Sequence, residues 1–371
     1  MNEPEAPADY LRRELKRLGM SQTDLAFVLG VPQPNVSALV NGRRGLSATM
    51  ARALSLVLDA EPEHILGLQK TFELHQELAR ADEPDLGIGR RAHLVRTYPI
   101  REMAKRGWIG NHRDTLEEDV ATFFEVDSVD AAPRMAHAAR KTGVGIPAAQ
   151  LAWLYRAKQL AETMVSPAYT PAKLQRAIDE ELPPLRITPE EARRVPRILD
   201  ECGVRFLVVQ GLPGSKIDGA CFWLDGGSTP VVALSMRFDR IDNFWFVLRH
   251  ELEHVLRRDG VDLPLEAVAV DANLDGTEEA EAEKIANAAA ADFCVPKRKM
   301  DSFVARKGPR FSTRDVLGFA RVQGVHPGLV AGQVRQRTSN YRIFSKMLVK
   351  IRHVIVQTAV ADGWGDIAPL F

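Results

Sequence analysis

The sequence predicts a multidomain α+β protein with an all-helical N-terminal domain, a helical middle region, and a C-terminal domain that combines a small sheet with helices. At 371 residues the chain is longer than most single domains. Its first part contains short helical segments separated by glycine, whereas residues 204–236 contain short apolar segments separated by glycine and proline turns. We place the domains at 1–80, 81–195 and 196–345, followed by a C-terminal tail at 346–371.

Two short helices joined by a glycine turn are predicted near the N-terminus. Ser21-Gln22-Thr23-Asp24 is a variant of the capping box, so the first helix begins here and ends before Gly30. The second helix has proline in its first turn and ends at Gly42. This arrangement predicts a helix-turn-helix. The apolar residues expected to pack the two helices together are Leu25, Val28, Val31, Val36 and Leu39.

The second of these helices carries a polar face that suits the edges of DNA bases. Its members are Gln33, Asn35, Ser37 and Asn41. We expect Gln22, Arg43 and Arg44 to contact phosphate oxygens. Residues 1–70 hold eight basic and eight acidic side chains, so DNA affinity should be local and dimeric rather than spread over a basic patch.

The segment from Tyr10 through Leu68 resembles the XRE helix-turn-helix family, and within it the HigA-type antitoxins. The resemblance is carried by Ser21-Gln22-x-x-Leu25-Ala26 and by Asn41-Gly42-Arg43-Arg44. It implies operator DNA as a partner. A helical module used only for protein contacts or dimerisation is the alternative.

A metal-binding pattern occupies residues 250–254, which read His250-Glu251-Leu252-Glu253-His254. Four-residue spacing places both imidazoles on one side of a helix, where two nitrogens can bind one ion at about 2.0–2.1 Å. Glu251 lies beside that row and can take a proton from a water at the metal, which is the general-base role in this motif. A core helix with incidental histidines is the alternative. The stripe expected to face the core is Ile241, Phe244, Leu248, Leu252, Val255 and Leu256.

A third ligand is expected from another helix, because catalytic zinc sites usually take three protein groups. The segment 277–296 has acidic residues near its start, an alanine-rich centre, and Pro296 at its end. We choose Glu283 as the ligand, and Glu279 or Glu281 would replace it if the helical register differed.

The pattern Phe244-Trp245-Phe246-x-x-x-His250-Glu251-x-x-His254, followed by Glu283-x-x-Ala286-Asn287, resembles the ImmA/IrrE metallopeptidase family. The resemblance covers about residues 200–340. It implies a compact, zincin-like zinc metallopeptidase whose relatives cleave transcriptional repressors, with Zn²⁺ held by His250, His254 and Glu283. Glu253 stands where relatives usually have a small residue, and Ala289 where they often have an aromatic one.

The remaining segments carry less chemical information. Strands are predicted at Val204–Val209, Gly219–Leu224 and Val231–Met236, and an edge of this sheet could bind a substrate peptide as an added strand. Asp82–Gly89 is the expected interdomain joint. Cleft residues could be Asn243, Trp245 and Arg237, which would equally suit core or surface positions. His326 is the candidate for an oxyanion donor, although it also suits the end of a connection.

Composition indicates a cytoplasmic regulator. The formal net charge is zero, and the N-terminus lacks a signal sequence. No two of the three cysteines have the close spacing of a metal-binding pair. Three hypotheses follow. The chain is a DNA-binding zinc endopeptidase that regulates transcription or a stress response by cleaving a partner protein such as a repressor. Alternatively, it is a HigA-like antitoxin that binds operator DNA and a toxin and has a structural or vestigial metal site. The third hypothesis is an interaction scaffold.

Overall fold

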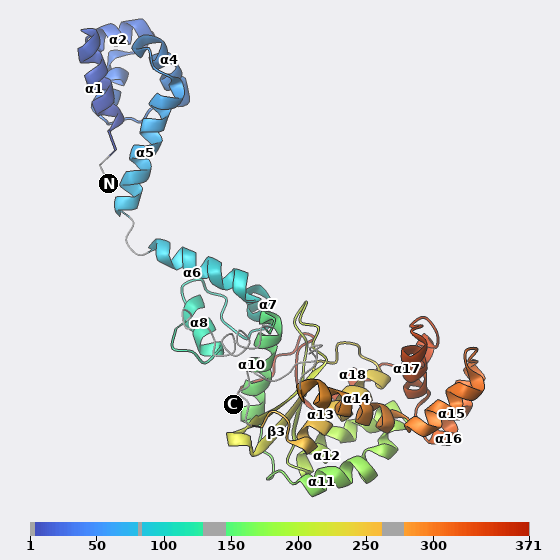
Figure 1. Cartoon of the computed structure of the whole chain (residues 1–371). Coiled ribbons are helices and arrows are strands. Elements are labelled where there is room, and N and C mark those ends of the chain that lie inside the picture. Colours follow the sequence, from blue (N-terminus) through green and yellow to red (C-terminus); the bar gives the residue numbers. More distant parts are fainter. Residues whose placement is uncertain (1–3, 81–83, 129–145, 262–277, 371) are drawn as a thin grey trace. The chain divides into compact units, whose positions relative to one another are not determined.

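The computed structural model describes residues 4–80, 84–128, 146–261 and 278–370. The chain divides into two compact units, Met1–Gly89 and Arg90–Phe371 (Figure 1). Each unit is described by itself. Among the described residues, no helix is both long enough and apolar enough to cross a membrane.

The first unit is all-helical, as predicted. Its hydrophobic core is formed by side chains from every helix, including Leu11, Leu25, Val36, Leu54 and Ile65. The capping box predicted at Ser21 and Asp24 is present in full, with each side chain accepting a backbone N–H of the other residue. The helices are α1 (Pro7–Leu18), α2 (Gln22–Leu29), α3 (Gln33–Val40), α4 (Ala48–Leu58) and α5 (Pro62–Arg80).

The interdomain joint expected at Asp82–Gly89 ends where the two units divide, after Gly89. Residues 81–83 lie outside the described part of the chain, and helix α6 begins directly after them and spans Pro84–Thr97. Residues 84–89 of this joint are therefore helical. Proline suits the first turn of a helix, and Leu94 anchors the later turns of α6 in the core of the second unit.

The second unit is built around a four-stranded mixed sheet with the order β2-β3-β1-β4. The three predicted strands are present, as β1 (Arg205–Val209), β2 (Gly219–Leu224) and β3 (Thr229–Leu234). Strand β1 pairs in parallel with β3 and with β4 (Val360–Asp362), whereas β2 pairs antiparallel to β3. The segment predicted as a C-terminal tail thus supplies a strand.

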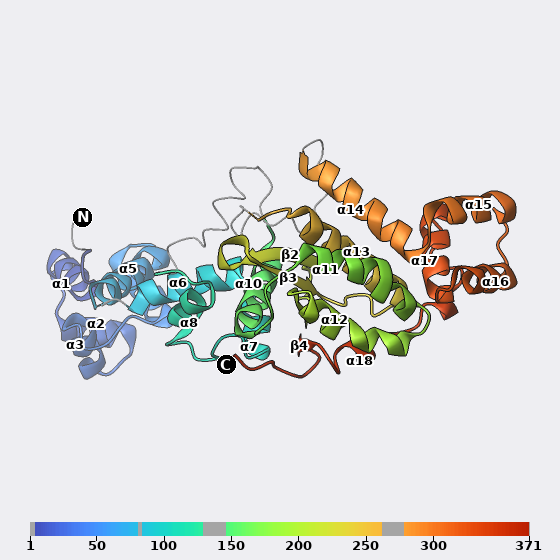
Figure 2. The same ribbon diagram turned by 90° about the horizontal axis from the view of Figure 1, so that it is seen from below.

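Both faces of this sheet are buried, because successive side chains of a strand point to opposite sides. Phe206 and Val208 belong to the core that includes α13 (Ile241–Arg257), whereas Leu207 and Val209 belong to the core that includes α10 (Ala148–Thr163). Figures 1 and 2 show these two helices on opposite sides of the strands. The helical segment predicted to connect the domains therefore covers one face of the sheet.

The remaining helices complete the two layers. Beside α10 lie α7 (Ile100–Lys105) and α8 (Leu116–Phe123). On the side of α13 the elements are α11 (Pro171–Arg176), η1 (Ala177–Glu181), η2 (Pro183–Arg186), η3 (Pro189–Arg194), α12 (Val195–Glu201), α14 (Glu278–Cys294), α15 (Lys297–Lys307), α16 (Thr313–Gln323), α17 (Pro327–Thr338) and α18 (Arg352–Ile355). The three cysteines are free and buried, which agrees with packing roles.

A buried ion pair fixes β4 against α10. The guanidinium of Arg156 donates to the carboxylate of Asp362, with 2.8 Å between Nε and Oδ2, and also to the carbonyl of Ala368 at 2.8 Å. The indole of Trp108 donates to Oδ1 of Asp362 at 3.1 Å. Arg156 and Asp362 are 3% and 1% exposed, so each charge depends on the other for compensation.

We expect Asp362→Asn to lower the free energy of unfolding of the second unit by about 3–5 kcal/mol, because it leaves the buried Arg156 charge uncompensated. Guanidinium unfolding followed by tryptophan fluorescence measures this unit selectively, since all five tryptophans lie beyond residue 90. The matched control is Glu201→Gln, whose ion pair with Arg197 is exposed and should be worth less than about 1 kcal/mol. Equal effects of the two substitutions would contradict a structural role for the buried pair.

Candidate functional site

The site is built on α13, whose amphipathic sequence determines which side faces the core. Phe244, Leu248 and Leu252 are fully buried on this helix, as the predicted stripe required, and only Leu256 is partly exposed. The helix ends at Arg258, which adopts a left-handed conformation and donates its N–H to carbonyls of the last turn. The stripe thus holds α13 against the sheet and fixes the positions of both histidines.

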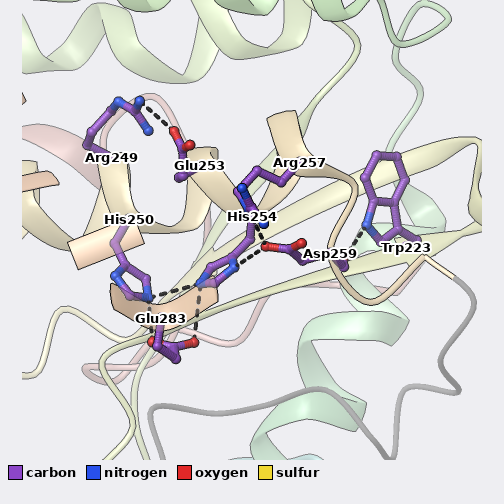
Figure 3. Close-up of polar contacts among 8 residues, drawn as sticks. All are labelled: Trp223, Arg249, His250, Glu253, His254, Arg257, Asp259 and Glu283. Atoms are coloured by element: carbon purple, nitrogen blue, oxygen red, sulfur yellow. Dashed lines mark hydrogen bonds and ion pairs between the residues drawn. The ribbon is translucent and has the colours of Figure 1, made fainter. Parts of the chain in front are cut away.

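Helix α14 brings a carboxylate to these histidines. Ala286 and Ala290 are fully buried, and their small side chains lie one and two turns from Glu283 on the same side of the helix. Figure 3 shows Glu283 facing His250 and His254. Of the two alternatives, Glu281 is exposed, and the side chain of Glu279 lies outside the described residues. The structure therefore brings together the three ligands chosen from the sequence.

The three side chains form a compact set of donors. The Nε2 atoms of His250 and His254 are 3.1 Å apart. Glu283 places Oε2 3.2 Å from Nε2 of His250 and Oε1 3.3 Å from Nε2 of His254. Ligands at about 2.0–2.1 Å from a tetrahedral zinc ion lie about 3.3–3.4 Å from one another. Two imidazoles and one carboxylate at this spacing fit a zinc ion and leave a fourth position for another ligand.

Hydrogen bonding controls the ionisation of these groups. Burial alone would lower the pKa of His250 and of His254, but hydrogen bonds to Glu283 outweigh it and raise the pKa of both rings. Burial would raise the pKa of Glu283, yet its hydrogen bonds to the two imidazoles lower it to about 2. Glu283 is thus an ionised carboxylate, and a metal cation would take the place of the protons that it stabilises on the rings.

Glu251 lies one residue from the first histidine and points toward the sheet. It is 4% exposed. A Cβ added at Gly219, the first residue of β2, would lie 2.8 Å from Oε1 of Glu251 and 2.8 Å from Cγ1 of Val247. Glycine is therefore required here by the close approach of the carboxylate to the strand.

A second carboxylate that the sequence analysis missed orients His254. Oδ2 of Asp259 lies 2.9 Å from Nδ1 of His254, and the same oxygen is 3.3 Å from Nε of Arg257. The backbone carbonyl of Asp259 accepts from the indole of Trp223 at 3.0 Å (Figure 3). Histidines that bind a metal through one ring nitrogen commonly donate the other ring N–H to a carboxylate, which fixes the orientation of the ring. Asp259 follows the end of α13, where helical spacing gives no signal of this contact.

Glu253, which stands where the ImmA/IrrE relatives usually have a small residue, forms an ion pair with Arg249 instead of joining the histidines. Oε2 of Glu253 lies 2.7 Å from Nη2 of Arg249, and Figure 3 shows this pair apart from the histidines. The extra acid is thus neutralised on its own helix and does not join the donor set.

Four further residues were suggested from the sequence, three for a cleft and one as an oxyanion donor. Trp245 is fully buried, so its suggested place in a cleft is wrong and its core alternative holds. Arg237 forms a two-point ion pair with Asp218, at 3.0 and 2.8 Å. Asn243 lines a cavity of about 210 Å³. His326 is the N-cap of α17, where its Nδ1 accepts the N–H of Gly328 at 3.0 Å, in agreement with the role of ending a connection.

In the first unit, the polar face of α3 is accessible to a ligand. Gln33 and Asn41 are exposed, Asn35 and Ser37 are half-buried, and Asn41 Nδ2 donates to Ser37 Oγ at 3.2 Å. The expected phosphate contacts are also accessible, with Arg43 and Arg44 exposed and Gln22 half-buried.

The prediction that Val28 packs in the core of this unit is wrong. Val28 is 56% exposed. The inward face of α2 is centred between Leu25, Ala26 and Leu29, and Val28 lies about 100° around the helix from that centre.

A family described as helix-turn-helix matches residues 11–65. The chain belongs to this helix-turn-helix family through its N-terminal domain. Virulence-associated protein A' of Dichelobacter nodosus is 36% identical over 77 residues, which span 20% of this chain and 67% of the relative. A crystal structure of a hypothetical protein from E. coli matches with 31% identity and a TM-score of 0.19, covering 23% of this chain and 98% of that one. The helix-turn-helix domain is of the XRE type and binds DNA.

We expect Gln33→Ala to weaken binding to a preferred DNA site by about 1–3 kcal/mol and to leave binding to other sequences unchanged. Arg43→Ala should weaken binding to all sequences and reduce the salt slope by about 1. The preferred site is obtained by selection from random duplexes, and gel shifts at two salt concentrations compare it with a scrambled duplex. Gln175→Ala, in the second unit, is the control. Unchanged selectivity in a Gln33→Ala, Asn35→Ala double variant would contradict the assignment of α3 as the reading helix.

Proposed function

We propose that this protein is a DNA-binding, zinc-dependent endopeptidase that regulates transcription or a stress response by cleaving a partner protein, such as a repressor. The observation that carries the proposal is the convergence of His250, His254 and Glu283 at distances that suit tetrahedral zinc. The helix-turn-helix domain supports the regulatory part, because it would bring the peptidase to operator DNA.

Each group has a role in peptide hydrolysis. His250, His254 and Glu283 would hold the ion, and Asp259 would keep the ring of His254 in the orientation needed for binding. When bound, zinc supplies a Lewis acid that lowers the pKa of water and polarises a carbonyl. Glu251 would accept a proton on its carboxylate from the water that attacks the peptide carbonyl, and would donate it to the amine that departs when the C–N bond breaks. Its burial beside Gly219 holds the carboxylate in one place.

The sheet offers a place for the substrate backbone. Strand β2 is at one end of the strand order, so its outer edge is not paired with another strand among the described residues. An extended peptide added to this edge would use the unpaired backbone groups of β2. The edge begins at Gly219, against the carboxylate of Glu251, which would bring a bound peptide close to the general base.

We expect Glu251→Gln to abolish cleavage, by about 10²–10⁴-fold, while zinc content and thermal stability stay unchanged, because the amide cannot accept the proton. Glu253→Gln is the matched control on the same helix, since its partner is Arg249 rather than the metal site. The protein is incubated with the products of neighbouring genes, and new N-termini are identified by mass spectrometry. Zinc binding without cleavage by the unsubstituted protein would contradict the proposal and favour an antitoxin role.

Asp259→Asn should weaken zinc binding by about 10- to 100-fold, because the imidazole of His254 loses the carboxylate that orients it. Competition with a chromogenic chelator measures the affinity. Asp114→Asn, at an 82% exposed position, is the control. If both variants bind zinc as the unsubstituted protein does, Asp259 has no part in the metal site.

A further inference from the structure

A cavity of about 340 Å³ lies at the carboxyl ends of the three parallel strands. Residues 210–216 follow β1, residues 235–237 follow β3, and Trp364 follows β4. In open sheets with parallel strands, ligands bind outside the carboxyl ends of those strands. The volume is within the range of small-molecule sites, about 300–1,000 Å³. None of the predicted metal ligands lines this cavity, so it is a separate candidate site.

All charged residues that line this cavity are basic: Lys216, Arg237 and Arg352. Arg237 is paired with Asp218, and Arg352 is paired with Asp239 at 3.2 Å. Asp239 also accepts the backbone N–H groups of residues 351 and 352. Lys216 is exposed and forms no ion pair within the described ranges. Two neutralised arginines and one additional lysine leave a net positive charge that suits an anion.

The loop that carries Lys216 is held in place from both sides. Gln150 donates to the carbonyl of Ser215 at 2.7 Å, and Ser235 Oγ donates to the carbonyl of Ile217 at 2.6 Å. Gly214 and Lys216 have φ of 79° and 53°, in the left-handed region. The N–H of Ser215, between these two residues, donates to the carbonyl of Leu212 at 3.0 Å and closes the turn. A preformed loop of this kind loses little conformational entropy when a ligand binds.

An aromatic ring completes the cavity. The guanidinium of Arg352 lies 4.7 Å from the centre of the Trp364 ring. A second cavity, of about 550 Å³, shares Arg352 and Trp364 and adds Lys350 and His353 to its lining. Asp239 and Asp366 also line the second cavity and offset the charges of Lys350 and Arg352, so the excess of basic residues is confined to the first cavity.

We propose that the first cavity binds a small phosphorylated molecule, with its phosphate against Lys216 and the 211–216 loop and the guanidinium groups of Arg237 and Arg352 beside it. Phosphate suits this set, because guanidinium and ammonium groups form strong, charge-assisted hydrogen bonds with its oxygens. Lys216 is three residues before Gly219, where an added Cβ would lie 2.8 Å from Oε1 of Glu251. A bound ligand would thus act on the strand that positions the general base; this coupling, unlike the binding itself, rests on the proposed function.

The test is isothermal titration calorimetry of the full chain at constant ionic strength, with inorganic phosphate, adenosine monophosphate and adenosine as probes. We expect saturable binding of the two phosphorylated probes and none of adenosine. Lys216→Gln should weaken the binding about tenfold or more, which corresponds to one charge-assisted hydrogen bond, and Lys216→Arg should retain it. The side chain of Lys216 is exposed, so equal melting temperatures will show that these variants fold alike.

Two controls locate the binding. Lys299→Gln removes an exposed lysine from α15, and Arg52→Gln removes an exposed cation from α4 of the helix-turn-helix domain; neither should change the affinity. The proposal is overturned if neither phosphorylated probe binds, if adenosine binds as tightly as its monophosphate, or if Lys216→Gln binds normally. Binding lost in Glu283→Gln and kept in Lys216→Gln would assign the phosphate to the metal site instead. Because binding is measured directly, the result does not depend on peptidase activity.

Discussion

The contact between one carboxylate and two imidazoles is the interaction on which the account of the second unit depends. Glu283, His250 and His254 are largely withdrawn from water, where polar groups are costly unless they satisfy one another or bind an ion. Their neighbours are arranged to allow this contact. The buried stripe of α13 fixes the histidines, and two buried alanines let α14 approach closely enough for its glutamate to reach them.

The sheet connects this contact to the rest of the unit. Strand β2 begins with a glycine beside Glu251, and the parallel strands β1, β3 and β4 end at a basic cavity. Both faces are covered, so the strands are held in place between α10 and α13. The buried Arg156–Asp362 pair then joins α10 to the last strand, which makes the C-terminal segment part of the framework that supports the site. The candidate metal ligands, the proposed general base and the basic cavity thus share one support.

Strong periodic or spaced patterns made much of this structure predictable. The His250–His254 spacing, the apolar stripe of α13 and the alanines near Glu283 correctly predicted which side chains meet, and the capping box predicted where α2 begins. Contacts of residues that belong to no periodic sequence pattern were not predicted. Asp259 lies beyond a helix end, β4 has three residues, and its partner Arg156 is 206 residues away in the sequence. Val28 was misplaced because it lies about 100° around α2 from the centre of the buried face, which its apolar character alone does not show.

The central claim is that one zinc ion binds to His250, His254 and Glu283. Anomalous diffraction from crystals of the zinc-loaded protein, with data collected on both sides of the zinc absorption edge, tests this directly. The account predicts a single strong peak in the second unit, about 2.0–2.2 Å from both Nε2 atoms and from a carboxylate oxygen of Glu283. A zinc peak elsewhere, or none between these three side chains in crystals grown with saturating zinc, would contradict the account.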